Sequence, residues 1–193
     1  MESNKASMRV ISGKHKGKKI FYVNNSTTRP LRDFVKENIF NIIYHSNLIN
    51  IKIKDATVLD LYSGIGSFGI ECISREASAV TFVEKDKNTL NYLNKNIKAL
   101  LIEDKISLFK GDASQFLKQK KGKKYDVIFL DPPYAETDYL NDLKIINNLD
   151  ILNKKHLIII HREKNLKEKL EKLIDIKIIK YYGRSKVIFG CLF

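Results

Sequence analysis

The segment Asp131-Pro132-Pro133-Tyr134 combines residue types that could bind and orient an amino group. It directly follows the apolar run DVIFL, which predicts a buried strand that ends in a rigid turn. An exocyclic amino group of a nucleobase has two hydrogens, which the Asp131 carboxylate and the Pro132 carbonyl could accept. Tyr134 adds an aromatic face on which an extruded base could stack, a contact worth about 1–3 kcal/mol. These four residues are the candidate catalytic residues; an ordinary turn is the alternative, because Asp-Pro commonly starts one.

A glycine-rich turn after the run TVLDL is the second candidate site. Its glycines permit a tight turn and a close approach of a ligand to the backbone. The pattern also fits a nicotinamide dinucleotide, because Glu84 lies 20 residues beyond Gly64 at the end of the next predicted strand. Since that cofactor and S-adenosylmethionine both carry an adenosine ribose, a dehydrogenase, a methyltransferase and a purely structural turn all remain open for this segment alone.

Three features favour S-adenosylmethionine. Asp60 precedes the glycines, where its carboxylate could meet the ammonium group of the methionine part but would repel a pyrophosphate. Asp112 ends the third predicted strand and could accept from the adenine amino group, with a helix N-cap as the alternative. The DPPY segment is the strongest feature, and catalysis there needs only positioning of nitrogen and methyl carbon about 3–3.5 Å apart, without a metal. The predicted cofactor-binding residues of this part are Asp60, Tyr62, Ser63, Gly64, Gly66, Gly69, Glu84, Lys85, Asp112 and Ala113.

The elements that position these residues alternate along the chain. Short apolar runs predict strands at residues 57–64, 79–86, 106–113, 126–133 and 156–163. Helical stretches are predicted at residues 66–76, 87–101, 114–119, 137–149 and 164–173. Buried strands separated by helices indicate a doubly wound α/β sheet. The final run IDIKIIKYYGRSKVIFGCLF has no room for a helix, and it predicts an antiparallel hairpin added to one edge of the sheet.

The N-terminal part follows a different pattern. Residues 8–23 predict a small β-hairpin with lysines at its tip. Residues 33–46 predict an amphipathic helix. We therefore expect a single domain over residues 1–193, in which an extension at 8–50 precedes a catalytic core at 55–193.

Charge and cysteine usage limit the function classes. The 193 residues include 35 Lys and Arg against 22 Asp and Glu, and the net charge of +13 favours a nucleic acid as partner over a merely solvated lysine surface. Cys72 and Cys191 form no CxxC pair, so neither a disulfide framework nor a zinc cluster is expected. No export signal and no membrane span are expected, which favours a reducing cytoplasm. The histidines lack metal-ligand spacing and are assigned no site: His15, His45, His156 and His161.

Six motifs together resemble the RsmD-type bacterial ribosomal RNA guanine-N2 methyltransferases over nearly the full length: RVISGKHKGKKI, RPLRDFVKENIFN, LDLYSGIGSFGIECISREA, VTFVEKD, DVIFLDPPY and YYGRSKVIFG. This resemblance implies a seven-stranded Rossmann-like methyltransferase fold, S-adenosylmethionine as cofactor, and a guanine of small-subunit (16S) ribosomal RNA as target. The substrate would be the free RNA or the small ribosomal subunit, and we expect a monomer. The phosphate contacts implied are Arg9, Lys14, Lys16, Lys18, Lys19 and Arg29.

The second motif departs from the family pattern RPTTDRVRE at Leu31, Arg32 and Phe34. Hydroxyl contacts from the two missing threonines are therefore not expected, whereas Asp33 matches and is predicted near the cofactor. Two alternatives stay open: adenine-N6 methylation of DNA or RNA, and a non-catalytic RNA-binding factor in ribosome assembly.

Overall fold

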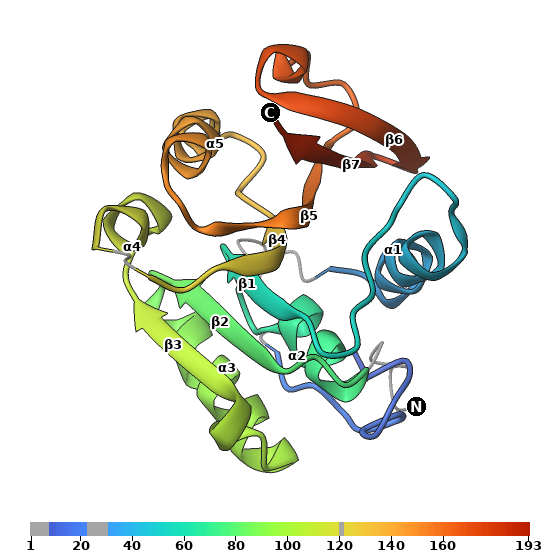
Figure 1. Cartoon of the computed structure of the whole chain (residues 1–193). Helices are drawn as coiled ribbons and strands as arrows, with labels where there is room; N and C mark the ends of the chain where they lie inside the picture. The colour runs from blue at the N-terminus through green and yellow to red at the C-terminus, as the bar shows by residue number, and fades with distance from the viewer. Residues whose placement is uncertain (1–7, 23–30, 120–121) are drawn as a thin grey trace.

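Seven strands form one mixed sheet in the order β3-β2-β1-β4-β5-β7-β6 (Figure 1). The computed structural model describes residues 8–22, 31–119 and 122–193. The parallel strands are β1 (Thr57–Leu61), β2 (Ala79–Glu84), β3 (Ile106–Lys110), β4 (Tyr125–Leu130) and β5 (Leu152–Glu163). The antiparallel hairpin of β6 (Ile174–Tyr182) and β7 (Ser185–Leu192) extends the sheet beyond β5. The predicted doubly wound sheet and its terminal hairpin are confirmed.

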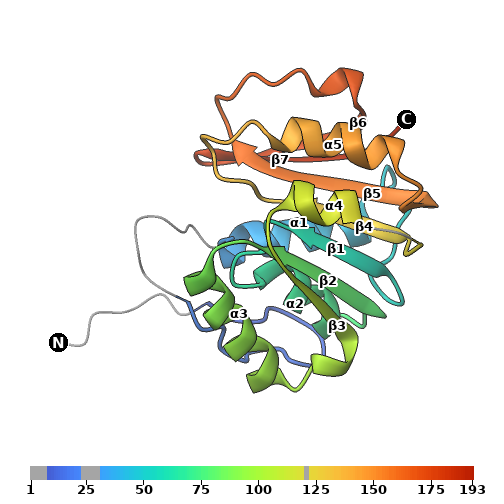
Figure 2. The ribbon, with the colours of Figure 1, turned by 90° about the vertical axis from the view of Figure 1, so that its left-hand side faces the viewer.

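Helices cover both faces of the sheet (Figures 1 and 2). The helices α1 (Asp33–His45), α2 (Ser67–Ser74) and α3 (Lys87–Leu100) pack on one face, and α4 (Ala113–Gln119) and α5 (Tyr139–Asn148) on the other. Because side chains alternate along a strand, Val127 and Phe129 of β4 enter the first core layer, whereas Ile128 and Leu130 enter the second. Both faces of the central strands are therefore apolar, which explains their continuous hydrophobic runs.

The helix predicted at residues 164–173 is wrong. Strand β5 begins at Leu152 and runs to Glu163, and the chain beyond it forms only a 3-10 turn, η2 (Leu170–Lys172). Glu168 in this segment pairs with Arg162 at 2.8 Å, and Leu170 is buried against the second core layer. These tertiary contacts fix the segment in a non-helical path that local propensity does not indicate.

The predicted N-terminal hairpin is present but short: Arg9 and Lys19 form an antiparallel bridge, and the N–H groups of Val10 and Ile20 donate to the carbonyls of Lys18 and Met8 at 2.9 Å. The Glu71 carboxylate of α2 accepts hydrogen bonds from the backbone N–H groups of Ile11 and Ser12, at 2.8 and 2.9 Å. Since those donors are used by a side chain, they do not form a strand ladder. The segment instead lies along α2, as Figure 2 shows.

A buried lysine joins this segment to two helices. The Lys36 ammonium group donates to the carbonyl of Arg9 at 2.9 Å and to the Ser67 hydroxyl at 3.3 Å. Its charge is compensated by Glu71 at 3.7 Å and by Asp33 at 3.5 Å. Burial lowers the pKa of Lys36 despite these carboxylates. Because Lys36 lies on α1 and both Ser67 and Glu71 lie on α2, the network fixes α1 against α2.

Candidate active site

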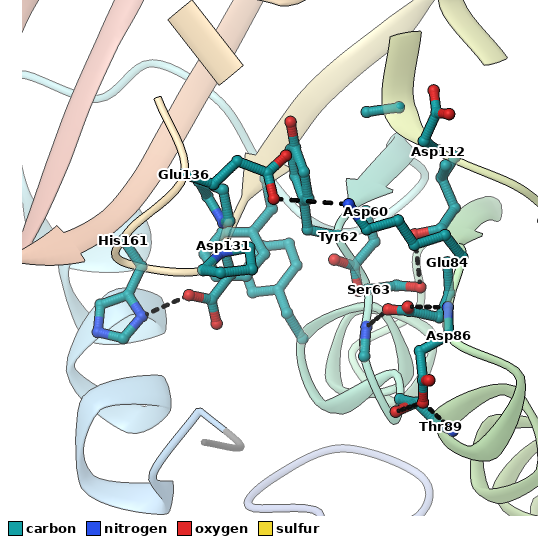
Figure 3. Close-up of a pocket in the computed structure, with 18 of the residues that line it drawn as sticks. Asp60, Tyr62, Ser63, Glu84, Asp86, Thr89, Asp112, Asp131, Glu136 and His161 are labelled. Atoms are coloured by element: carbon teal, nitrogen blue, oxygen red, sulfur yellow. Dashed lines mark hydrogen bonds and ion pairs between the residues drawn. The ribbon is translucent and has the colours of Figure 1, made fainter. Parts of the chain in front are cut away.

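A cavity of about 820 Å³ opens at the carboxyl ends of the central parallel strands (Figure 3). Open α/β sheets bind their ligands at this edge, and the volume lies within the range of small-molecule sites. Twelve of the predicted site residues line it: Asp60, Tyr62, Ser63, Gly64, Glu84, Lys85, Asp112, Ala113, Asp131, Pro132, Pro133 and Tyr134. The predicted cofactor and methyl-acceptor groups therefore face one common space.

The glycine-rich turn is held by Glu84 at the end of β2. One Glu84 oxygen accepts from the Gly64 N–H at 2.8 Å, and the other accepts from the Asp86 N–H at 2.8 Å. Gly64 has a φ of +55° and open space where a Cβ would lie, which lets a ligand approach the backbone. The Glu84 carboxylate thus organises the loop as well as facing the cavity.

Gly66 and Gly69 serve packing and do not line the cavity. A Cβ on Gly66 would lie 2.5 Å from a Leu93 methyl group, and one on Gly69 would lie 2.3 Å from the Phe82 ring. Gly66 also has a φ of +84°, a conformation that other residues rarely adopt. These two glycines let α2 start close to the sheet, which positions the turn between them and β1.

Asp60 offers an unused acceptor at the base of the cavity. One of its oxygens accepts from the Gly69 N–H at 2.9 Å, whereas Oδ1 is buried with no hydrogen-bond partner among the described residues. Burial raises the pKa of Asp60 well above its usual value, and the charges of Asp131 and Glu84 add to this. A cationic ligand group would satisfy this oxygen, and the ammonium of S-adenosylmethionine fits that requirement.

Asp112 and Tyr62 form a further part of the cavity wall. Asp112 accepts from the Gln115 N–H at 2.7 Å, so it caps α4, the alternative considered for it, while it also lines the cavity. The Tyr62 hydroxyl donates to Asp142 at 2.5 Å, and Ser114 donates to the other oxygen of Asp142 at 2.7 Å. Burial and the Asp142 carboxylate raise the pKa of Tyr62. The wall is therefore fixed by side chains from α4, α5 and the turn that follows β1.

Asp131 is paired with a histidine from the neighbouring strand. The parallel register aligns Leu130 with Ile160, which brings Asp131 beside His161, and their Oδ1 and Nδ1 atoms lie 2.9 Å apart. Burial lowers the pKa of His161, but the charge and hydrogen bond of Asp131 outweigh it, and the net shift is upward. The His161 ring also meets Tyr134 edge to face at 6.2 Å. Figure 3 shows this pair across the cavity from Glu84 and Asp112.

Arg162 holds the DPPY segment from behind. Its fully buried guanidinium donates to the carbonyls of Pro133 at 2.9 Å, Glu136 at 2.9 Å, Tyr134 at 3.2 Å and Pro132 at 3.3 Å. The Pro132 carbonyl, predicted to accept from the amino group, therefore already accepts one long hydrogen bond and keeps one lone pair. The rigidity attributed to the two prolines depends equally on this arginine.

Asp33 and the lysine tip of the N-terminal segment, both predicted as contacts, do not line the cavity. Asp33 does not line it and pairs instead with Lys36, so its cofactor contact stays a prediction. Lys14 donates its backbone N–H to the carbonyl of Ser74, the last residue of α2, which places the lysine tip toward the amino ends of the strands. Lys16 and Lys18 follow in the same turn. Arg29 lies outside the described residues.

Two residues missed from the sequence are His161 and Arg162. The absence of metal spacing removed His161 from consideration, and nothing local marked Arg162. Their position in the sequence could have identified them. A polar His-Arg pair interrupts the apolar run LIIIHRE, which forms the strand after the one that carries DPPY. Adjacent parallel strands would place their ends together.

In the described part of the chain, no group of three or more His, Cys, Asp or Glu could hold a metal ion. None of its helices is long and apolar enough to cross a membrane.

The sheet order, the position of the cavity and its carboxylates are those of a Rossmann-like methyltransferase. The solved structure of the Escherichia coli protein yhhF, named as a methyltransferase, matches with a TM-score of 0.81 at 25% identity, covering 96% of this chain and 98% of that one. The protein is a methyltransferase of this fold, with S-adenosylmethionine as the methyl donor.

Sequence comparison identifies the family. Residues 8–190 match the family described as "Conserved hypothetical protein 95". The chain is 34% identical over 165 residues to "Ribosomal RNA small subunit methyltransferase D" of Buchnera aphidicola subsp. Baizongia pistaciae, covering 86% of this chain and 81% of that protein. It is 36% identical over 132 residues to the protein of the same name from Haemophilus influenzae, covering 67% and 65%. The chain belongs to this family, and the RsmD-type resemblance is confirmed.

Proposed function

We propose that this enzyme transfers a methyl group to the exocyclic N2 amino group of a guanine in small-subunit (16S) ribosomal RNA. The observation that carries the proposal is the Asp131 carboxylate, which lines the cofactor cavity and is held by His161 at 2.9 Å. The net charge of +13 suits a polyanionic substrate, and the names of the relatives specify the small-subunit ribosomal RNA. The choice of guanine N2 comes from the RsmD-type resemblance. A small-subunit substrate also implies action in the cytoplasm.

Different residues around the cavity would bind the cofactor and promote methyl transfer. S-adenosylmethionine supplies a methyl group that its positive sulfonium already activates. Asp60 would hold the ammonium group of the methionine part, Glu84 the ribose hydroxyls and Asp112 the adenine amino group. With the cofactor held in this way, catalysis would depend mainly on holding the amine in line with the methyl carbon.

The acceptor side is organised around Asp131. His161 occupies Oδ1 of Asp131, which leaves Oδ2 to accept a hydrogen from the amine. As the nitrogen–methyl bond forms and the sulfur–methyl bond breaks, positive charge develops on the nitrogen, and the carboxylate stabilises it and takes the proton. The remaining lone pair of the Pro132 carbonyl can accept the second amine hydrogen, and Tyr134 provides the surface for stacking. Arg162 keeps this loop in place throughout.

Transfer of a tritiated methyl group to small subunits that lack the modification tests the proposal. We expect incorporation, and digestion to nucleosides with mass spectrometry should give N2-methylguanosine. N6-methyladenosine would instead support the adenine alternative. No incorporation by a folded protein that binds S-adenosylmethionine in a calorimeter would contradict the proposal and favour an assembly factor. Parallel reactions with free 16S RNA and assembled subunits decide which of the two is the substrate.

A further inference from the structure

We propose that an aromatic and basic surface beside the cavity binds the single-stranded RNA that flanks the target base. This surface, the turn patch, surrounds the end of the β6–β7 hairpin: Phe34 and Tyr182 lie on the α1 side of the sheet, Lys164 and Tyr181 lie on the opposite side, and Arg184 lies in the turn between them. It contains the end of β6, the turn to β7, the residue after β5 and the first turn of α1. The inference rests on the proposed function, because it names where the RNA of that reaction lies.

Strand register places the turn patch at the same edge of the sheet as Asp131. His161 of β5 aligns with Val187 of β7, and Glu163 aligns with Ser185, which in turn aligns with Tyr182 of β6. Three strand spacings separate β4 from β6, so the end of β6 lies roughly 14 Å from the DPPY segment. Figure 1 shows the end of this hairpin next to α1. An RNA strand whose target base enters the cavity therefore passes the patch within a few nucleotides.

Exposed aromatic rings give the patch its binding chemistry. Phe34 is 64% exposed and Tyr181 is 58% exposed, although rings of this size are normally buried. The Phe34 ring meets the half-buried Tyr182 ring edge to face at 6.0 Å. Leu31, three residues before Phe34, lines the cavity, so the aromatic surface continues from the cavity wall. Solvent-exposed rings beside a base-binding site can stack unpaired bases without sequence preference.

The charges favour RNA as the occupant. The Lys164 N–H donates to the Arg184 carbonyl at 2.8 Å, which brings two exposed basic residues together, and the Lys164 ammonium lies 5.8 Å from the Tyr181 ring centre. The cavity itself is lined by carboxylates that would repel phosphates: Asp60, Glu84, Asp86, Asp112, Asp131, Glu136, Asp138 and Asp142. Phosphates are therefore excluded from the cavity and attracted to the patch, while a neutral base can enter.

The experiment compares two kinds of change in the full-length protein. Lys164→Ala with Arg184→Ala removes two positive charges from the patch, and Tyr181→Ala removes a ring, with Tyr181→Phe as its conservative partner. Lys52→Ala with Lys98→Ala removes the same charge from exposed positions near the amino ends of the strands and serves as the control. Filter binding to unmodified 16S RNA over a range of salt concentrations, methyl transfer to small subunits, and calorimetry with S-adenosylmethionine are measured for each.

The two kinds of change should have different signatures. Loss of the two patch charges should weaken RNA binding and reduce the slope of log K against log salt by about 1.4, the value for two single-strand phosphate contacts. Tyr181→Ala should weaken binding about 5- to 150-fold with an unchanged slope, whereas Tyr181→Phe should bind like the wild type. Cofactor affinity should stay the same in every variant.

Three outcomes would overturn the inference. The first is an equal loss of RNA binding in the patch and control variants, which would indicate nonspecific attraction to a basic protein. The second is RNA binding like that of the wild type in all patch variants. The third is unchanged binding to naked RNA with loss of binding to assembled subunits, which would identify a protein as the partner. If the wild type binds RNA through the turn patch but transfers no methyl group, the proposed function is wrong, whereas the RNA-binding role of the turn patch is supported.

Discussion

The two sides of the cavity are built in different ways. On the cofactor side, Glu84 binds the N–H of Gly64, Asp60 binds that of Gly69, and Asp112 caps the helix that follows it. On the acceptor side, the DPPY segment is held by His161 and Arg162 of the neighbouring strand, about 30 positions along the chain. The first side fixes its own loops, whereas the second depends on a strand that carries no motif of its own.

The two sides of the cavity should therefore respond differently to substitution. Carboxylates on the cofactor side both shape a loop and face the cavity, so a change there should alter ligand affinity first. The acceptor side separates these roles, because Asp131 and Tyr134 face the cavity while Arg162 only supports them. Changes behind the DPPY segment should therefore alter stability and turnover before they alter cofactor affinity.

The largest effect is expected for Arg162→Met. Loss of the guanidinium removes four hydrogen bonds to carbonyls and the 2.8 Å ion pair with Glu168, and breaking a buried ion pair from one side costs about 3–5 kcal/mol. Urea unfolding should show this loss in the free energy of unfolding. The exposed neighbour Lys164→Met is the control and should change it by less than about 0.5 kcal/mol. A loss below about 1 kcal/mol would mean that the loop is held by its prolines.

Asp131→Ala should abolish most transfer while sparing cofactor binding. Removal of one preorganised electrostatic group typically costs about 100- to 1000-fold in kcat, and we expect the same here. Asp131→Asn keeps an acceptor oxygen and should lose less. Single-turnover transfer and calorimetry with S-adenosylmethionine measure the two quantities. Activity of the alanine variant within tenfold of the wild type would remove Asp131 from its assigned role.

Asp60→Asn should separate affinity from stability. Loss of a charge-assisted bond of roughly 1.5–3 kcal/mol should weaken S-adenosylmethionine binding about 10- to 150-fold. Because burial raises the pKa of Asp60 in the folded state, stability falls as the pH rises from its usual value through the raised one. An asparagine cannot ionise and does not lose stability in this way. The cofactor-free variant should therefore be more stable than the wild type at about pH 8 by roughly 1 kcal/mol. Unchanged affinity would argue against an ammonium contact.

The smallest effect, about tenfold in kcat, is expected for His161→Asn, because the asparagine can still donate to Asp131. The pKa of His161 is raised above 6.5. Above this raised pKa His161 is neutral, which should make Asp131 a stronger acceptor. The wild-type rate should therefore increase as the pH rises through the raised pKa of His161. The raised pKa also means that stability from the charged pair is full below 6.5 and disappears as the pH rises through the folded value. The variant should lack both trends. A pH profile identical to that of the wild type would exclude the pair from turnover.

Much of the cavity was predictable because its parts are local in sequence. A strand followed by glycines, and a strand followed by Asp-Pro-Pro-Tyr, each place a polar group at the carboxyl end of a parallel strand. The sheet geometry then brings those ends together, so the residues from Asp60 to Tyr134 could be assigned to one site. Gly66 and Gly69 were predicted as ligand contacts but serve packing, because the proximity of Leu93 and Phe82 cannot be read from the turn itself.

Residue types and short spacings were enough to predict the alternating core, the order of the motifs and the chemistry suited to an amino group. The side chains that support this chemistry became evident only from the folded chain. Arg162 and His161 gain their roles from the register of β5 beside β4, and the segment at 164–173 loses its helix because Glu168 turns inward to Arg162. The lysine tip lies toward the opposite edge because Glu71 and Ser74 bind its backbone. Contacts between positions distant in the chain depend on register and burial, which no local pattern encodes.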